Sequence, residues 1–73
     1  MRIKVKPIGL IRNYLNEQDV DIVPGCTPRV LVKELGIPQE LKMAVFINGE
    51  KKNLDDELQE NDEIKLVTLA TGG

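Results

Sequence analysis

The segment TPRVLVKELG, residues 27–36, carries the most complete set of helix signals in the chain. The Thr27 hydroxyl can cap a free amide of the first turn, and Pro28 suits the first helical position. Leu31 and Leu35 lie one turn apart and predict one apolar face, and the closing glycine is placed to end the helix. We therefore predict one main helix, and the class of fold depends on what surrounds it.

Strand patterns lie on both sides of this helix. The dipeptide Asn48-Gly49 is a strong hairpin signal, because both residues tolerate the positive φ of a tight turn. The predicted elements, in chain order, are a strand at 2–6, a short helix or helical loop at 9–15, a strand at 19–23, the main helix, strands at 43–47 and 50–53, and a last strand at 62–69. This order predicts an α+β class, with a mixed sheet packed on one main helix in a single domain spanning 1–73.

Composition excludes several classes of function. The chain has 73 residues and a net charge of −2, so it has no excess of positive charge for a nucleic-acid partner. No segment approaches the roughly 20 apolar residues of a membrane span, and the first residues alternate instead of forming a secretory signal. The single cysteine, Cys26, rules out an internal disulfide. We predict a cytoplasmic protein with no nucleic-acid or membrane partner.

The residues for catalysis are missing. There is no histidine, which removes the usual general base and the usual metal ligand, so we predict no metal site and no bound cofactor. Cys26 precedes the helix cap, where a helix N-terminus can lower a thiol pKa, but it has no histidine or second cysteine to work with. We interpret it as an ordinary turn cysteine. The glycines at 9, 25, 36 and 49 are isolated and form no phosphate-binding loop.

Alternation predicts which side chains lie on the sheet face away from the helix. If Ile64 and Leu66 point at the helix, then Lys65, Val67 and Leu69 share the outer face, and Phe46 joins them from a neighbouring strand. An apolar patch with a charged rim is typical of a partner-binding site. The alternative is a register shifted by one residue, which would place Phe46 in the core.

Opposite charges on the first two predicted strands suggest cross-strand ion pairs. Asp19 and Asp21 alternate with apolar residues on one strand, and Lys4 and Lys6 do so on the other. We expect these carboxylates to pair with these lysines across the sheet.

The sequence ends Ala70-Thr71-Gly72-Gly73, directly after the last predicted strand. Glycine has no Cβ, so this predicted flexible tail, 70–73, can thread a narrow cleft and present its carboxylate to the active site of another enzyme. The alternative is that the glycines are a frayed chain end. Since the rest of the chain offers no reactive group, the Gly73 carboxylate is the leading candidate.

The chain resembles the ubiquitin-like sulfur-carrier family, the MoaD/ThiS group, and within it the small subunits of molybdopterin synthase most closely. The residues that carry this resemblance are the short helix at 10–15, the Pro24-Gly25-Cys26-Thr27 turn, the hairpin at 45–50, the segment 58–64 and the terminal diglycine. Two features depart from the family pattern. Prolines common before the tail are absent from 67–70, and Asn61 stands where a glycine is frequent.

The resemblance implies a β-grasp fold and a carrier role, not an enzyme. A partner E1-like adenylating enzyme would use ATP to adenylate Gly73, which would become a thiocarboxylate, with Gly72 and Thr71 inserting into the partners. Sulfur would pass to an acceptor enzyme, the large subunit of molybdopterin synthase or its equivalent, for a molybdenum or tungsten cofactor. Alternatives are a thiamine-thiazole or other sulfur carrier, a ubiquitin-like protein modifier, or a non-catalytic β-grasp binding module.

Overall fold

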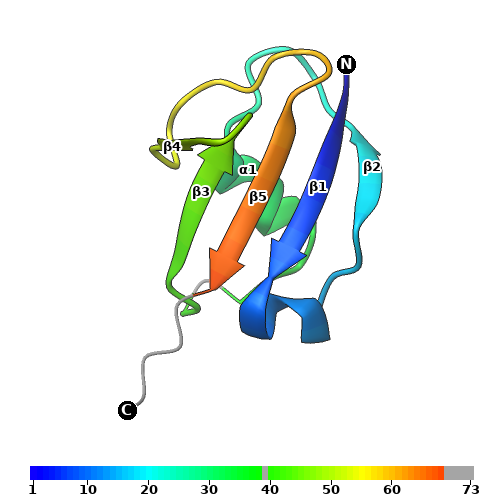
Figure 1. Cartoon of the computed structure of the whole chain (residues 1–73). Helices are drawn as coiled ribbons and strands as arrows, with labels where there is room; N and C mark the ends of the chain where they lie inside the picture. The colour runs from blue at the N-terminus through cyan, green and yellow to red at the C-terminus, as the bar shows by residue number, and fades with distance from the viewer. Residues whose placement is uncertain (39, 69–73) are drawn as a thin grey trace.

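Five strands form one sheet, and a single α-helix packs on one of its faces. The computed structural model describes residues 1–38 and 40–68. Its elements are β1 (Arg2–Ile8), the 3₁₀-helix η1 (Gly9–Asn13), β2 (Gln18–Asp21), α1 (Pro28–Glu34), β3 (Met43–Ile47), β4 (Glu50–Lys52) and β5 (Glu63–Thr68). The strand order is β2-β1-β5-β3-β4 (Figure 1). The predicted domain tail, 70–73, lies outside the described residues.

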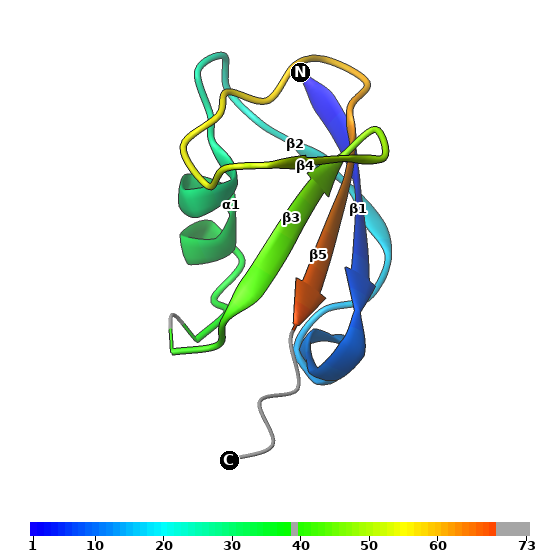
Figure 2. The ribbon, with the colours of Figure 1, turned by 60° about the vertical axis from the view of Figure 1, so that its left-hand side comes forward.

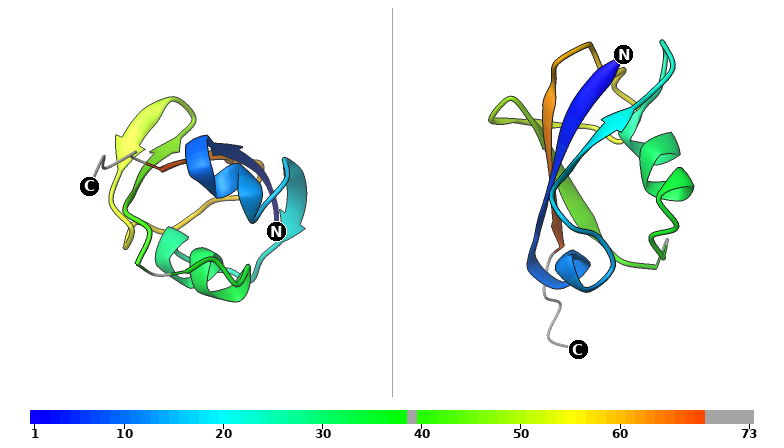
Figure 3. Two further views of the ribbon diagram at one scale, coloured as in Figure 1. Left: turned by 90° about the horizontal axis from the view of Figure 1, so that it is seen from below. Right: turned by 90° about the vertical axis from the view of Figure 1, so that its right-hand side faces the viewer.

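The sheet is mixed, as predicted. β5 runs parallel to β1 and antiparallel to β3, while β1–β2 and β3–β4 are antiparallel pairs. Seen edge-on, α1 lies on one side of the sheet and the opposite side has no α-helix (Figure 3). This arrangement confirms the α+β class with one main helix. Among the described residues, no helix is long and apolar enough to cross a membrane.

The main helix begins and ends where its sequence signals predict. The Thr27 side chain accepts a hydrogen bond from the Val30 amide at 3.4 Å, and Pro28 occupies the first turn. Gly36 follows the helix with φ +73°, a conformation that glycine adopts without a steric penalty. The apolar face of α1 buries Pro28, Leu31 and Val32 against the sheet.

Pro7 lies inside β1 without breaking it, because its nitrogen needs no partner there. The Lys4 amide donates to the Asp62 carbonyl on the β5 side at 2.9 Å. Backbone nitrogens alternate in direction along a strand, so those of the odd-numbered residues of β1, including Pro7, face the β2 side. Pairing with β2 extends only as far as Val5↔Gln18. Pro7 therefore lies past the end of β2, and β1 continues to Ile8 along β5 alone.

The β3–β4 hairpin has the predicted turn and is anchored to β5. Asn48 and Gly49 have φ values of +53° and +87°. The Asn48 side chain donates to Asp62 Oδ1 at 2.9 Å and accepts from the Glu63 amide at 3.0 Å. These two hydrogen bonds hold the turn against the start of β5. Asn61, the residue that replaces a frequent family glycine, adopts φ +67° in the same region.

The core forms between α1 and the inner sheet face, and it is built from aliphatic side chains. The short helix at 9–15 contributes Ile11 and Leu15, whereas Leu10 and Tyr14, at the same helical spacing, are exposed. The largest fully buried residues are Ile3, Ile11, Leu31, Leu58, Ile64, Leu66, Val5, Val45 and Pro28. Val45 and Ile47 are buried while Phe46 is not, so the predicted register of β3 is confirmed.

Candidate functional site: the end of β5 and the outer sheet face

The chain leaves its described part at Thr68, the last residue of β5. The predicted reactive tail residues Gly73, Gly72 and Thr71, and the predicted contact residue Leu69, all lie outside the described residues. Because β5 runs parallel to β1, the C-terminal ends of both strands lie at the same end of the sheet, next to η1 (Figures 1 and 2). The site can therefore be built from the residues around this end of the sheet.

The Thr68 hydroxyl ties the end of β5 to the segment that follows β1. The Ile11 amide donates to Thr68 Oγ1 at 3.1 Å, and this hydroxyl in turn donates to the Ile8 carbonyl oxygen at 3.1 Å. The Thr68 side chain is buried, and both of its hydrogen-bonding roles are used. This fixes the point from which residues 69–73 continue.

Gly9 allows the end of β5 to lie close to the start of η1. Its φ is +88°, and a Cβ built on its backbone would lie 2.5 Å from Thr68 Oγ1 and 2.9 Å from the Thr68 carbonyl oxygen. Any side chain at this position would therefore collide with β5 as well as strain the backbone. From the sequence, Gly9 was predicted only to be an isolated glycine and Thr68 was not singled out, so neither residue was predicted to belong to the site. The partner of each is remote in sequence, and no local signal indicates the contact.

Three of the predicted contact residues, Phe46, Lys65 and Val67, lie on the outer face of the sheet. Phe46 lies opposite Lys65 on β5, and in the next row Val67 lies between Ala44 on β3 and Ile8 on β1. We call these five residues, Ile8, Ala44, Phe46, Lys65 and Val67, the outer-face patch. All are half-buried except Ile8, which is 41% exposed. Ile8 was not predicted, because a proline-containing strand was expected to end earlier.

Two further lysines flank this patch. Lys6 and Lys51 lie in the same cross-strand row as Lys65 and Phe46. Lys6 forms an ion pair with Glu63 at 3.2 Å, and no ion pair to Lys65 or Lys51 occurs within the described part of the chain. The patch therefore presents apolar side chains with a basic rim, the composition of a docking surface.

The predicted ion pairs between β1 and β2 are wrong. Asp21 pairs with Arg2 at 3.1 Å, and Lys6 pairs with Glu63. The register explains both differences, because Arg2 lies directly opposite Asp21 whereas Lys6 lies beyond the end of β2. Lys4 lies opposite Asp19, yet these two side chains form no ion pair.

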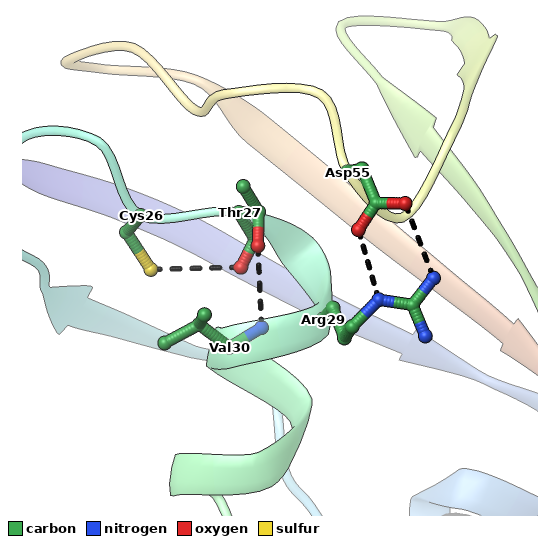
Figure 4. Close-up of polar contacts among 5 residues, drawn as sticks. All are labelled: Cys26, Thr27, Arg29, Val30 and Asp55. Atoms are coloured by element: carbon green, nitrogen blue, oxygen red, sulfur yellow. Dashed lines mark hydrogen bonds and ion pairs between the residues drawn. The ribbon is translucent and has the colours of Figure 1, made fainter.

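Cys26 is a buried structural thiol. Its Sγ donates to the Thr27 carbonyl oxygen at 3.6 Å, beside the cap that Thr27 makes to Val30 (Figure 4). Burial raises the pKa of the Cys26 thiol, and the negative charge of Glu34 raises it further. Both effects disfavour the thiolate, so the Cys26 thiol lacks the lowered pKa of an activated nucleophile.

Comparison with known families agrees with this arrangement. The model of the ThiS family matches residues 9–73. The chain belongs to the ubiquitin-like sulfur-carrier family. No curated protein sequence matches the chain significantly. The family match covers η1, the outer-face patch apart from Ile8, and the terminal diglycine, so in this sulfur-carrier family member the matched region spans most of the candidate site.

Several solved structures share the fold of this sulfur carrier. A Pyrococcus furiosus protein assigned as molybdopterin converting factor subunit 1 has a TM-score of 0.74 at 18% identity, covering 92% of this chain and 95% of that one. SAMP1 of Haloferax volcanii has a TM-score of 0.74 at 18% identity over 100% of both chains. A complex of molybdopterin-converting factor subunits 1 and 2 from Helicobacter pylori has 0.66 at 23% identity over 100% of both. These matches establish the β-grasp fold.

Proposed function

We propose that this protein carries sulfur as a thiocarboxylate on Gly73 and donates it in the biosynthesis of molybdopterin. The observation that carries the proposal is the position of the terminal diglycine, which follows Thr68 by a few residues at the pinned end of β5. Membership of the sulfur-carrier family supports the same role. The reactions themselves are assigned to partner enzymes, since Cys26 is buried and the chain has no histidine.

The proposed chemistry needs two steps at the Gly73 carboxyl group. First, a carboxylate oxygen bonds to the α-phosphorus of ATP, and pyrophosphate leaves. Hydrosulfide from a sulfur donor then attacks the carbonyl carbon, AMP leaves with the electron pair of the broken C–O bond, and a proton is released from the thioacid. The protein contributes a sterically open diglycine and a rigid support at Thr68, while the activating enzyme supplies the catalytic groups.

The outer-face patch is proposed to dock two partners in turn. One is an E1-like adenylating enzyme, and the other is a sulfur-acceptor enzyme, equivalent to the large subunit of molybdopterin synthase. The H. pylori structure, in which a subunit 1 of molybdopterin-converting factor forms a complex with subunit 2, supports the second partner. The apolar side chains of the patch favour binding to both partners.

The test is a mass measurement on the intact protein. Incubation with an E1-like activating enzyme, ATP and sulfide should replace one oxygen by sulfur, and the new mass should be lost when Gly73 is deleted. The matched control omits ATP. Failure to form the thiocarboxylate with any cognate activator would contradict the proposal. Conversion of a pterin precursor by the acceptor enzyme would then separate the molybdopterin pathway from thiamine-thiazole synthesis or another sulfur-requiring pathway.

A second candidate is attachment of Gly73 to lysines of other proteins. It is favoured by the likeness to SAMP1, described as small archaeal modifier protein 1 of H. volcanii. Both candidates share the adenylated glycine, so the mass measurement does not separate them. Isopeptide-linked conjugates in lysates of cells expressing the tagged protein would establish this second candidate. Unchanged function after deletion of Gly72 and Gly73 would instead indicate a binding module.

A further inference from the structure

An apolar groove lies between α1 and the start of β3, on the helix side of the sheet. Its volume is about 610 Å³. The walls are the aliphatic side chains Val30, Val32, Leu41, Met43 and Leu54. Val30 is 42% exposed although it lies on the main helix, and Leu41, Met43 and Leu54 are only half-buried. Figure 2 shows α1 and β3 side by side along this part of the molecule. The groove thus exposes apolar surface that the fold itself does not cover.

Among the residues that the structure describes, the charged side chains that line the groove are Arg29, Lys33 and Lys42, all of them basic, although the chain as a whole has a net charge of −2. Arg29 is neutralised by two hydrogen bonds to Asp55, at 2.8 and 3.3 Å (Figure 4). Within residues 1–38 and 40–68, neither Lys33 nor Lys42 forms an ion pair. Charge complementarity therefore favours an anionic occupant.

The edge of β3 beside the groove is open. β4 pairs with β3 only from Val45↔Lys52 onward, so no strand of the described part of the chain pairs with Met43 on that side. The Asn48 amide donates to the Glu63 carbonyl on the β5 side, and by alternation the N–H and C=O of Met43 point away from β5. An extended chain lying in the groove can bond to these backbone groups, which is how a strand is added to a sheet edge.

We propose that this groove binds an extended segment of a partner protein, with apolar side chains against its walls and acidic residues beside Lys33 and Lys42. Met43 is the register partner of Thr68, so the groove opens at the end of the molecule where the tail begins. The outer-face patch lies on the opposite side of the sheet. A partner held in the groove would therefore leave the patch accessible. This binding does not depend on the chemistry of Gly73.

The test is a titration of the isotope-labelled protein followed by amide chemical shifts. The probe is an eight-residue peptide with four central valine or isoleucine residues and two glutamates at each end, and the control peptide has lysines in place of the glutamates. We expect shifts at residues 30–33, 41–44 and 54, and none with the control peptide. Reversing both charges, with Lys33→Glu and Lys42→Glu, should weaken binding by about tenfold at low salt. Arg12→Glu, an exposed cation on η1, should not.

Several results would overturn the proposal. These are no shifts up to about 1 mM peptide, shifts confined to the outer-face patch, or equal binding of the lysine peptide. Groove shifts that appear on dilution of the free protein would assign the groove to a second copy of this chain. Groove shifts on deletion of residues 69–73 would assign it to the protein's own tail. Failure of thiocarboxylate formation would leave the titration unaffected, so the two proposals can fail separately.

Discussion

The Thr68 hydroxyl donates a hydrogen bond to the Ile8 carbonyl oxygen, 60 residues away in sequence, at a distance of 3.1 Å. The same hydroxyl accepts a hydrogen bond from the Ile11 amide, so one side chain joins the end of β5 to the start of η1. In the proposed function, Thr68 is the last described residue before the reactive tail. Its hydroxyl thus links the stability of the fold to the position of the functional end.

Replacing this hydroxyl should destabilise the protein although the shape changes little. Thr68→Val leaves a buried amide at Ile11 without a partner, and we expect the free energy of unfolding to fall by about 1–3 kcal/mol. Thr68→Ser keeps the hydroxyl and should lose less. Urea denaturation followed by circular dichroism measures both variants. Equal stability of the valine variant and the wild-type protein would mean that the two hydrogen bonds contribute nothing.

A matched pair of glycine substitutions isolates the contact between Gly9 and Thr68. Gly9 and Gly25 have nearly the same φ, +88° and +89°, but a Cβ at Gly25 meets nothing within 4 Å. Gly25→Ala should therefore lose only the backbone term, about 1 kcal/mol. Gly9→Ala should lose more, roughly 1–3 kcal/mol in addition, because the Cβ overlaps the end of β5. Similar losses in thermal denaturation would show that β5 yields to the added methyl group.

Short-range sequence signals predicted the helices and strands, but they could not predict the contacts between elements that are distant in sequence. Thr27 and Asn48-Gly49 act through neighbours within a few residues, so their roles follow from the sequence alone. The outer position of Phe46 followed from alternation along one strand. In contrast, the roles of Gly9 and Thr68 depend on β1 and β5 lying side by side in one register, and no local signal gives that register.

The predicted ion pairs between β1 and β2 failed for the same reason, because their partners depend on the register of the strands. Lys6 lies beyond the last β1–β2 pair, Val5↔Gln18, so it meets Glu63 on β5 and no aspartate of β2. The segment 9–15 was likewise predicted as a short helix or helical loop, yet the 3₁₀-helix η1 ends at Asn13. It buries Ile11, and Leu15 beyond it is also buried, whereas Leu10 and Tyr14 are exposed. The positions of helices and strands along the chain are thus easier to predict than the residues that each side chain contacts.

Cys26 should react slowly with alkylating reagents at neutral pH. Burial and the charge of Glu34 raise its pKa above the ordinary value of 9.0, so little thiolate forms near pH 7. Folding favours the protonated thiol. Its contribution to stability is therefore complete below pH 9, where the unfolded thiol titrates, and is lost as pH rises through the higher folded pKa. The ratio of the iodoacetamide labelling rates of urea-unfolded and folded protein should therefore be larger at neutral pH than above the folded pKa. Rapid labelling of the folded form at pH 7 would contradict this.

The outer-face patch should lose partner binding when its aromatic centre is removed, without loss of the fold. Phe46 is half-buried on a face that no α-helix covers, so Phe46→Ser removes contact area that a partner would use more than core packing. We expect binding to an E1-like activating enzyme, measured by calorimetry, to weaken by about 2 kcal/mol, or roughly 30-fold. Val23→Ser changes an apolar side chain that is 70% exposed and distant from the patch, so it should bind normally. Circular dichroism would verify that both variants remain folded. If both bind the enzyme as the wild-type protein does, the activating enzyme must recognise another surface, and the tail would then be presented from a different side of the sheet.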